Sequence, residues 1–345
     1  MKSWVFHSLR APADPRRTFA ELKRLTVRVV DWLAHPDTFE VTCEVITDIL
    51  SNYISFFTPE DESCLAGVIA SPWAVERYEN LVSGDGEWES LQFGRLLVAF
   101  AEATVQRMVR DFSGSHSQTL FRMLHGMVTV PGYPVAEEEV SGATFEFWSS
   151  LAEFLLDPQN VGEGELGPIT AFGKKEIMQT IEELWRKIQI PPSSQSQIWT
   201  KDQREGFMSF RKDVADLVEA AYGILGVELF DRLVSQIRGA LSHAETGDLV
   251  AWEEIEASLF CLDSLSDCLS DEPEEDSALK VMFGSRLFSM MADFGNHIPL
   301  KVRQTAVHMI GLLTYHSCWL AIADLFLKDR TRRFSKDGPI SYQPY

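Results

Sequence analysis

The chain has 345 residues, 45% of them hydrophobic, and 51 acidic against 31 basic residues give it a net charge of −20 at pH 7. This apolar content can fill a core, which excludes a chain that is disordered throughout. The negative charge repels phosphate groups, so direct binding to nucleic acid is disfavoured and a basic protein partner is favoured.

Segments with helical spacing of apolar residues follow one another from the start of the chain. The first covers 18–35, Pro36 ends it, and Asp37 or Thr38 is expected to cap the next. A third helix is expected to start at Thr58, because a capping hydroxyl precedes Pro59 there. The later helices expected in this half are 90–112, 117–130 and 142–157.

The second half continues in the same way, and no segment has a convincing strand pattern. Its expected helices are 174–188, 206–226, 227–241, 252–267, 278–294 and 300–317. Longer connections are expected at 157–173, 189–205 and 270–277. A long apolar stretch, 309–327, is interrupted by His316, Ser317 and Asp324, so it is interpreted as a core helix and not as a membrane span.

Four of these helices share one loose pattern, in which a capped start leads through polar residues to apolar positions at helical spacing. They start near 38, 144, 252 and 302, and the last two starts lie about 50 residues apart, close to the period of HEAT-type helix pairs. Such units bury their apolar faces only by stacking on neighbours. We therefore predict an all-α, HEAT-type helical-repeat solenoid, wound as a right-handed superhelix, in which 1–330 forms a single array and 331–345 an irregular tail.

The five cysteines carry no sign of metal or disulfide chemistry. Their odd number and the lack of a CxxC pair are typical of reduced, mostly buried thiols; they are Cys43, Cys64, Cys261, Cys268 and Cys318. The first 17 residues have no apolar core of the signal-peptide kind, so none is expected.

The clearest motif match is a misleading one. GEGELG, at 162–167, fits the dinucleotide pattern G-x-G-x-x-G, but a helix precedes it and Glu163 and Glu165 would repel a pyrophosphate. The histidines form no zinc motif, and no nucleophile elbow or phosphate-binding loop occurs. We therefore expect no enzyme activity, no cofactor and no metal.

The most charged point of the sequence is the acidic segment 271–276. It consists of Pro273 and five carboxylates, Asp271, Glu272, Glu274, Glu275 and Asp276. Two interpretations stay open, a solvated loop between helices and a recognition site for a basic protein surface. The basic run 328–336 likewise fits either a solvated helix end or a nuclear localisation patch.

Three phrases in order, at 207–226, 252–267 and 287–316, resemble the middle of importin-beta (karyopherin) receptors of the importin-thirteen and transportin-three branch. The resemblance covers the whole chain and is most specific over 145–316. Its first phrase contributes Phe207, Phe210, Arg211, Val214 and Asp216; its second, Trp252, Glu256, Ala257, Leu259 and Phe260; its third, Pro299, Arg303 and Thr305.

The resemblance implies an internal segment of a nuclear transport receptor that moves between nucleus and cytoplasm. Its implied partners are protein cargo, the GTPase Ran in its GTP form and phenylalanine-glycine nucleoporins, with no membrane and no nucleic acid bound directly. The motif residues are expected to be architectural: Trp252 packs between repeats, Glu256 satisfies a neighbouring helix or arginine, and Phe210 and Arg211 do the same one repeat earlier. The acidic segment 271–276 is the expected contact for Ran or basic cargo. The alternative is a HEAT-repeat scaffold of a non-transport complex.

Overall fold

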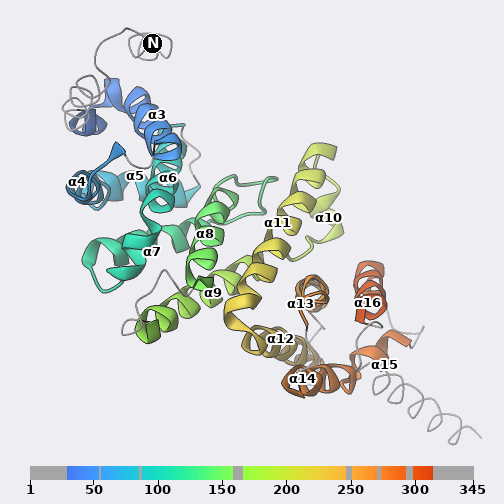
Figure 1. The fold of residues 1–345 in the computed structure, drawn as a ribbon. Helices are drawn as coiled ribbons and strands as arrows, with labels where there is room; N and C mark the ends of the chain where they lie inside the picture. Colours follow the sequence, from blue (N-terminus) through green and yellow to red (C-terminus); the bar gives the residue numbers. More distant parts are fainter. Residues whose placement is uncertain are drawn as a thin grey trace, which may run out of the picture. The chain divides into compact units, whose positions relative to one another are not determined.

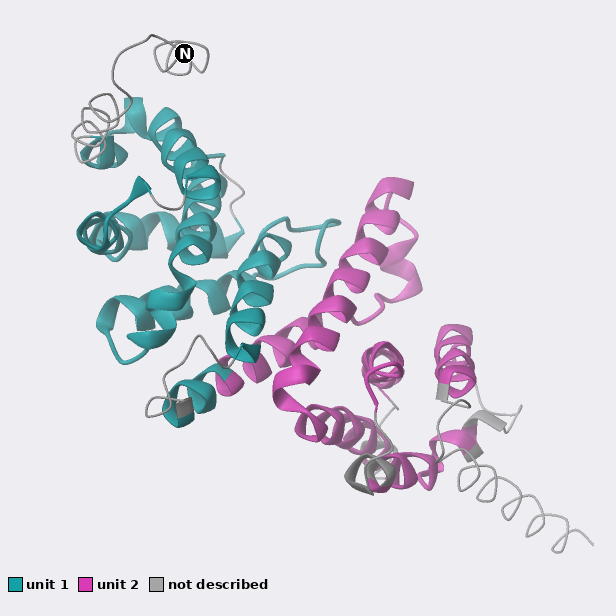
Figure 2. Cartoon of the chain, in the orientation of Figure 1, with its two compact units in different colours: residues 1–173 teal, residues 174–345 magenta. Residues whose placement is uncertain are grey.

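The computed structural model describes residues 29–53, 56–84, 88–157, 166–245, 251–269, 273–292 and 298–313. Within these ranges helices follow one another through turns, and the only β-type pairing is an isolated bridge between Pro134 and Glu138 (Figure 1). The chain divides into two compact units, 1–173 and 174–345 (Figure 2).

Unit 1 is built around one long helix. Its elements are η1 (Trp32–Ala34), α3 (Pro36–Asn52), α4 (Pro59–Ile69), α5 (Pro72–Ser83), α6 (Trp88–Arg110), α7 (Ser115–Val128), η3 (Ser141–Thr144), α8 (Phe145–Leu156) and the start of α9 (Leu166–Lys187). Helix α6 contacts α3, α5, α7 and α8. Its apolar residues face all of these neighbours, which is why Phe93, Leu96 and Phe100 are almost completely buried.

The starts of the helices in unit 1 follow local capping chemistry. The predicted start at Thr58 is confirmed, because the Thr58 hydroxyl accepts from the Asp61 N–H and the Asp61 carboxylate accepts from the Thr58 N–H at 2.9 Å. Helix η1 ends at Ala34, before Pro36 as expected, but neither Asp37 nor Thr38 caps the next helix: Pro36 is the first residue of α3, and His35 is its N-cap residue. Proline lacks an N–H, and the first helical turn does not need one, so Pro36 can begin α3.

Unit 2 arranges its helices in two layers. It contains the rest of α9, then α10 (Ser193–Ser196), α11 (Lys201–Leu225), α12 (Val227–Glu245), α13 (Trp252–Ser264), α14 (Pro273–Phe283), α15 (Arg286–Ala292) and α16 (Leu300–Leu313). Helix α13 contacts α11 and α16, and α12 contacts α13 and α14. One layer therefore runs α11, α13, α16 and the other contains α12 and α14, as Figure 1 shows.

Several predicted boundaries in unit 2 are wrong. The predicted connection 270–277 is too long, because α14 already begins at Pro273, and the predicted helix 278–294 is two helices separated at Gly284 and Ser285. Proline at the first position followed by carboxylates favours a helix start. Glycine is a poor helix former, and the Ser285 hydroxyl accepts from the Leu287 N–H as a new helix begins.

The other boundary errors are of the same kind. Helix α5 was not predicted, although Ser71 caps it and Gly84, at φ 82°, ends it in the left-handed conformation. The connection 189–205 is also too long, because a Thr200–Gln203 capping box starts α11 at Lys201. Helix α9 starts at Leu166, eight residues before the predicted start.

Some predictions fall outside the described residues. These are the helical pattern over 18–28, Gly162 to Glu165 of the GEGELG motif, Cys318, the basic run 328–336, the tail 331–345 and most of 309–327. Among the helices that the structure does describe, none combines the length and the apolar character that a bilayer span requires. The division into a single array over 1–330 and a tail stays a prediction.

Candidate functional site

The motif residues of the three sequence phrases meet in the interior of unit 2. Arg211 on α11 is completely buried and Glu256 on α13 is 1% exposed. The Arg211 Nη2 atom lies 2.9 Å from each oxygen of the Glu256 carboxylate, and the Thr305 hydroxyl on α16 donates to Glu256 Oε1 at 2.9 Å. One buried carboxylate thus joins the three successive helices of one layer.

Further contacts hold the Arg211 guanidinium in place. Its Nη1 donates to the Ile188 carbonyl at the end of α9, and its carbon atom lies 4.2 Å from the centre of the Phe260 ring. Burial raises the pKa of the neighbouring Cys261 thiol to about 12, although the Arg211 charge acts against this. A thiol that stays protonated is a weak nucleophile, so Cys261 behaves as a core residue.

The remaining motif residues divide between core and surface. Phe207, Phe210 and Ala257 are buried. Asp216 is exposed on α11, and Trp252 is half-buried as the first residue of α13. The exposed Pro299 precedes α16, its carbonyl accepts from the Arg303 N–H at 3.4 Å, and Arg303 is half-buried. The packing of Trp252 between repeats stays a prediction.

The acidic segment 271–276 is not a loop over its described residues, because α14 begins at Pro273. Glu274, Glu275 and Asp276 belong to the first turn of α14, while Asp271 and Glu272 lie outside the described residues. The backbone of these three residues is therefore helical and does not form the expected loop. Their role in binding a partner stays a prediction.

A second acidic cluster, which sequence reasoning missed, lies on the exposed side of unit 2. Asp213, Asp216 and Glu219 follow one another at helical spacing on α11, and Asp267 is exposed in the turn after α13. Burial and then the Asp216 charge raise the pKa of Asp213. We call these four residues the α11 acidic face; the i, i+3, i+6 spacing of three of them is visible in the sequence.

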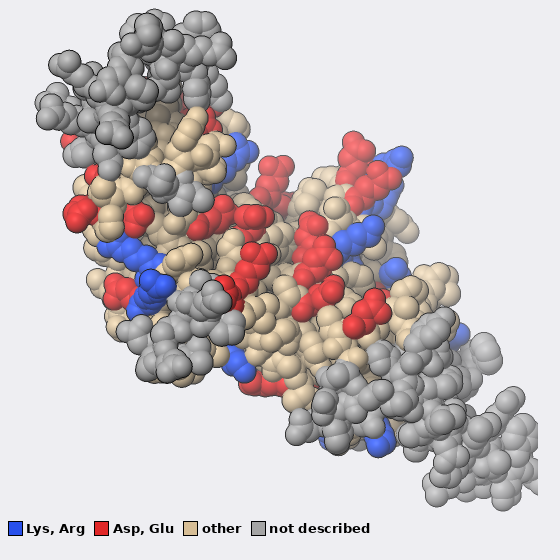
Figure 3. Space-filling view, viewed as in Figure 1, with Lys and Arg blue, Asp and Glu red and all other residues tan. Residues whose placement is uncertain are grey.

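The half-buried Cys268 lies close to two members of the α11 acidic face, Glu219 and Asp267. Its pKa is raised by burial first and then by the charges of Glu219 and Asp267, and its thiol hydrogen-bonds to Glu219. Like charges this close cost free energy unless a partner compensates them. On the face of the molecule in Figure 3, acidic side chains also outnumber basic ones.

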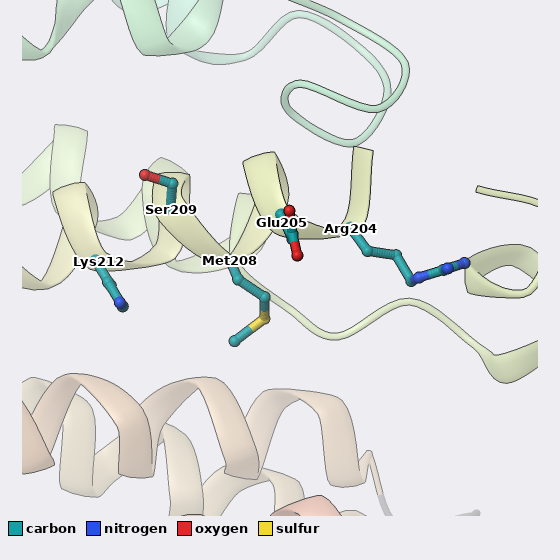
Figure 4. A pocket seen from close by; sticks show the side chains of 5 residues that line it. All are labelled: Arg204, Glu205, Met208, Ser209 and Lys212. Atoms are coloured by element: carbon teal, nitrogen blue, oxygen red, sulfur yellow. The ribbon is translucent and has the colours of Figure 1, made fainter. Parts of the chain in front are cut away.

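The N-terminal half of α11 has a different surface. A hollow of about 390 Å³ is lined by Arg204, Glu205, Met208, Ser209 and Lys212, all from this helix (Figure 4). Met208 is 38% exposed within this otherwise polar set. The hollow is open to solvent and combines an apolar floor with charged edges.

The described residues offer little to a metal ion. Nowhere in the described ranges do three His, Cys, Asp or Glu side chains converge in a way that could hold one. His308 on α16 instead pairs with Asp263 on α13, its Nδ1 lying 2.9 Å from both carboxylate oxygens. This pair adds a surface contact between the same two helices that Glu256 and Thr305 join inside.

Comparison with known proteins points to one group. No protein-family model matches the sequence. The chain is 27% identical over 326 residues to the importin beta-like protein kap111 of Schizosaccharomyces pombe, covering 94% of this chain and 31% of that protein. It is 26% and 25% identical to importin-13 of Gallus gallus and of Homo sapiens, over 154 residues that make up 44% of this chain and 15% of each relative.

A solved structure supports the fold. The structure described as "Importin13 cytosolic state" matches with a TM-score of 0.66 at 15% sequence identity, over 85% of this chain and 34% of that one. This likeness, with the helical layers of each unit, confirms the all-α, HEAT-type fold that the sequence predicts. The chain spans about a third of the length of kap111 and less of importin-13.

Proposed function

Since this chain is related to the importin-beta superfamily and, within it, to the importin-13-like branch, we propose that it is a cargo-binding segment of a nuclear transport receptor. The observation that carries the proposal is the similarity to an importin beta-like protein along 94% of the chain. The complete receptor would bind Ran-GTP and phenylalanine-glycine nucleoporins and would shuttle between nucleus and cytoplasm.

The charge distribution supports a basic cargo. The chain carries a net charge of −20, and the α11 acidic face gathers four carboxylates on one exposed side of unit 2. The acidic segment 271–276 begins four residues after Asp267 in the sequence. Exposed charges of one sign steer a partner of the opposite sign and select against like-charged proteins, with a strength that falls as salt is added.

The transport part of the proposal is tested by binding to the transport machinery. The chain, extended to the full N-terminus of its protein, is immobilised and offered Ran-GTP, Ran-GDP and phenylalanine-glycine repeats. Selective retention of Ran-GTP together with the repeats is expected. Retention of neither would contradict transport and would favour the HEAT-repeat scaffold instead.

The cargo part is tested by removing charge while keeping side-chain size. We expect Asp213→Asn, Asp216→Asn and Glu219→Gln together to weaken binding of a fluorescent lysine-rich peptide about tenfold at low salt and to flatten its salt dependence. Neutralising Asp271, Glu272, Glu274, Glu275 and Asp276 in a second variant tests the acidic segment separately.

A matched control keeps the loss of net charge the same. Glu60, Glu76 and Glu79 are exposed on α4 and α5 of unit 1, and changing all three to Gln removes the same three charges at another place. Equal weakening by this control and by the α11 variant would mean that only net charge matters. Such a result would remove the α11 acidic face as a cargo site.

A further inference from the structure

The hollow on the N-terminal half of α11 is not explained by an acidic cargo surface. Its two cations, Arg204 and Lys212, lie at its ends, and Met208 lies midway between them in sequence. The spacing of four residues places all three along one ridge of the helix. In Figure 4, Met208 and Lys212 extend to the same side of α11, whereas Arg204 extends towards the chain that precedes the helix.

The cation at the N-terminal end is fixed in position. Arg204 Nη1 donates to the Trp199 carbonyl at 2.5 Å, in the turn before α11, and to the Ser196 carbonyl at 3.5 Å, at the end of α10. These bonds occupy one of the three guanidinium nitrogens and leave the others available to a ligand. The same turn presents Ile198, whose side chain is 80% exposed. An apolar residue therefore lies exposed in the turn that Arg204 holds.

The lining residues carry two cations and one carboxylate, and the exposed Asp213 and Asp216 begin the α11 acidic face directly after Lys212. The carboxylate among the lining residues belongs to Glu205, which lies 3.5 Å from the ammonium group of Lys201 and is partly neutralised by it. Lys212 is exposed and makes no ion pair with any described residue. Because the chain as a whole is strongly acidic, a cation–apolar–cation arrangement stands out from its surroundings.

The spacing along α11 defines what would fit. Residues 204 and 212 are separated by about 12 Å along the axis at 1.5 Å per residue, with Met208 near the middle. An extended peptide covers about 13 Å in four residues. A segment with acidic residues four apart and an apolar residue between them matches this backbone spacing. One carboxylate would lie near Lys212, the apolar side chain on Met208, and the second carboxylate at the end of the hollow where Arg204 extends towards the preceding turn. Methionine adapts to apolar groups of different shape.

We propose that the hollow of Arg204, Met208 and Lys212 binds an extended acidic–x–apolar–x–acidic segment of a partner protein. This partner differs in charge from the basic cargo proposed above, so the inference does not rest on the transport function. Under this proposal the two parts of α11 bind partners of opposite charge: an acidic segment at 204–212 and a basic cargo at 213–219.

The test uses the complete 345-residue chain and a fluorescein-labelled peptide Gly-Asp-Ser-Leu-Ser-Asp-Gly, with binding followed by fluorescence anisotropy. Saturable binding is expected at peptide concentrations below about 1 mM. Asn in place of both Asp residues, or Ser in place of Leu, should each weaken binding about tenfold, because each removes one half of the recognition.

Variants of the chain locate the site. Lys212→Glu should weaken binding about tenfold and Met208→Ser about fivefold. Lys212 is the main target, since Arg204 also holds the preceding turn. As a matched control, Lys301→Glu reverses an exposed cation on α16 and should leave the affinity unchanged. Circular dichroism establishes that each variant is folded.

Three results would overturn the proposal: no saturable binding by the folded chain, equal affinity for the peptides with and without Asp, or equal weakening by Lys212→Glu and Lys301→Glu. The outcome does not depend on Ran or nucleoporins. Loss of the transport function would therefore leave this test intact, and failure here would leave the transport proposal standing.

Discussion

The two units hold their interiors together with different chemistry. In unit 1 the centre between α7, α8 and α9 is aromatic: the Phe121 ring lies 5.8 Å from Phe147, 6.4 Å from Trp148 and 5.0 Å from Phe172. In unit 2 the interior between α11, α13 and α16 contains the buried Arg211–Glu256 pair and Thr305.

This difference shows that one helical-repeat fold tolerates two kinds of core. Aromatic packing depends on shape and buried area, and small losses of volume reduce it gradually. A buried ion pair gains little over apolar packing of equal volume, yet losing one member leaves an uncompensated charge in a dry interior. Unit 2 should therefore be far more sensitive to single changes at its centre than unit 1.

The largest effect is expected from Glu256→Ala. Removal of the carboxylate leaves the Arg211 guanidinium buried without its counter-ion and the Thr305 hydroxyl without its acceptor. We expect the free energy of unfolding of unit 2 to fall by about 3–5 kcal/mol. Urea unfolding followed by circular dichroism, with limited proteolysis to tell which unit opens, measures this change.

A double variant serves as the control. Arg211→Met with Glu256→Leu replaces the pair by apolar side chains and should restore most of the lost stability. If the double variant is as unstable as Glu256→Ala, the stability of unit 2 depends on the volume or shape of these side chains and not on an unpaired charge.

A smaller effect is expected at the aromatic centre of unit 1. Phe121→Leu keeps an apolar side chain but removes ring contacts with Phe147, Trp148 and Phe172, and it should cost about 1–2 kcal/mol. The same urea experiment, run at pH 5 and pH 8, should give equal losses because no charge is involved. A loss as large as that of Glu256→Ala would remove the contrast between the units.

The smallest effect is expected at Glu102, the half-buried carboxyl of α6 in unit 1. Burial, and then the charge of Glu146 on α8, raise its pKa to about 7 from 4.5. The folded state therefore holds this proton more tightly than the unfolded chain, and the resulting stability is complete below pH 4.5 and is lost as the pH rises through 7.

Glu102→Gln should remove this dependence. Above pH 7 the variant should be more stable than the parent by about 1 kcal/mol, a value reduced for the partial exposure of the group. Near pH 5 the two should be almost equal. The midpoint of thermal unfolding between pH 5 and pH 8 provides the comparison, and an unchanged difference across this range would contradict the raised pKa.

Local chemistry accounts for the success and for the failures of the sequence predictions. The helix start at Thr58 was predictable because a capping hydroxyl, a proline and an acid three residues after the cap act within one turn. The same logic, applied to Ser71–Pro72 and to Pro273, would have found α5 and the true start of α14. The run of acidic residues after Pro273 resembles a solvated loop in composition, but its position directly after a proline is typical of a helix start.

Some features of the candidate sites can be predicted from the sequence, and others require the structure. The acidic spacing of Asp213, Asp216 and Glu219 is present in the sequence, since residues on one helix keep a fixed geometry. The contact of Asp267 and Cys268 with that face requires α13 to lie against α11. The hollow at Met208 also required the structure, because periodicity alone does not separate an exposed methionine from a buried one.

By itself, the sequence determined the helical period, the repeat character, the acidic balance and the likeness to importin-beta receptors. The first three follow from composition and from spacing within single segments, whereas the likeness rests on the three phrases at 207–226, 252–267 and 287–316. Tertiary structure decided that Arg211, Glu256 and Thr305, which lie 45 and 49 residues apart in turn, share one buried contact. Such a contact depends on which helices become neighbours when the repeats stack, and no local pattern records that.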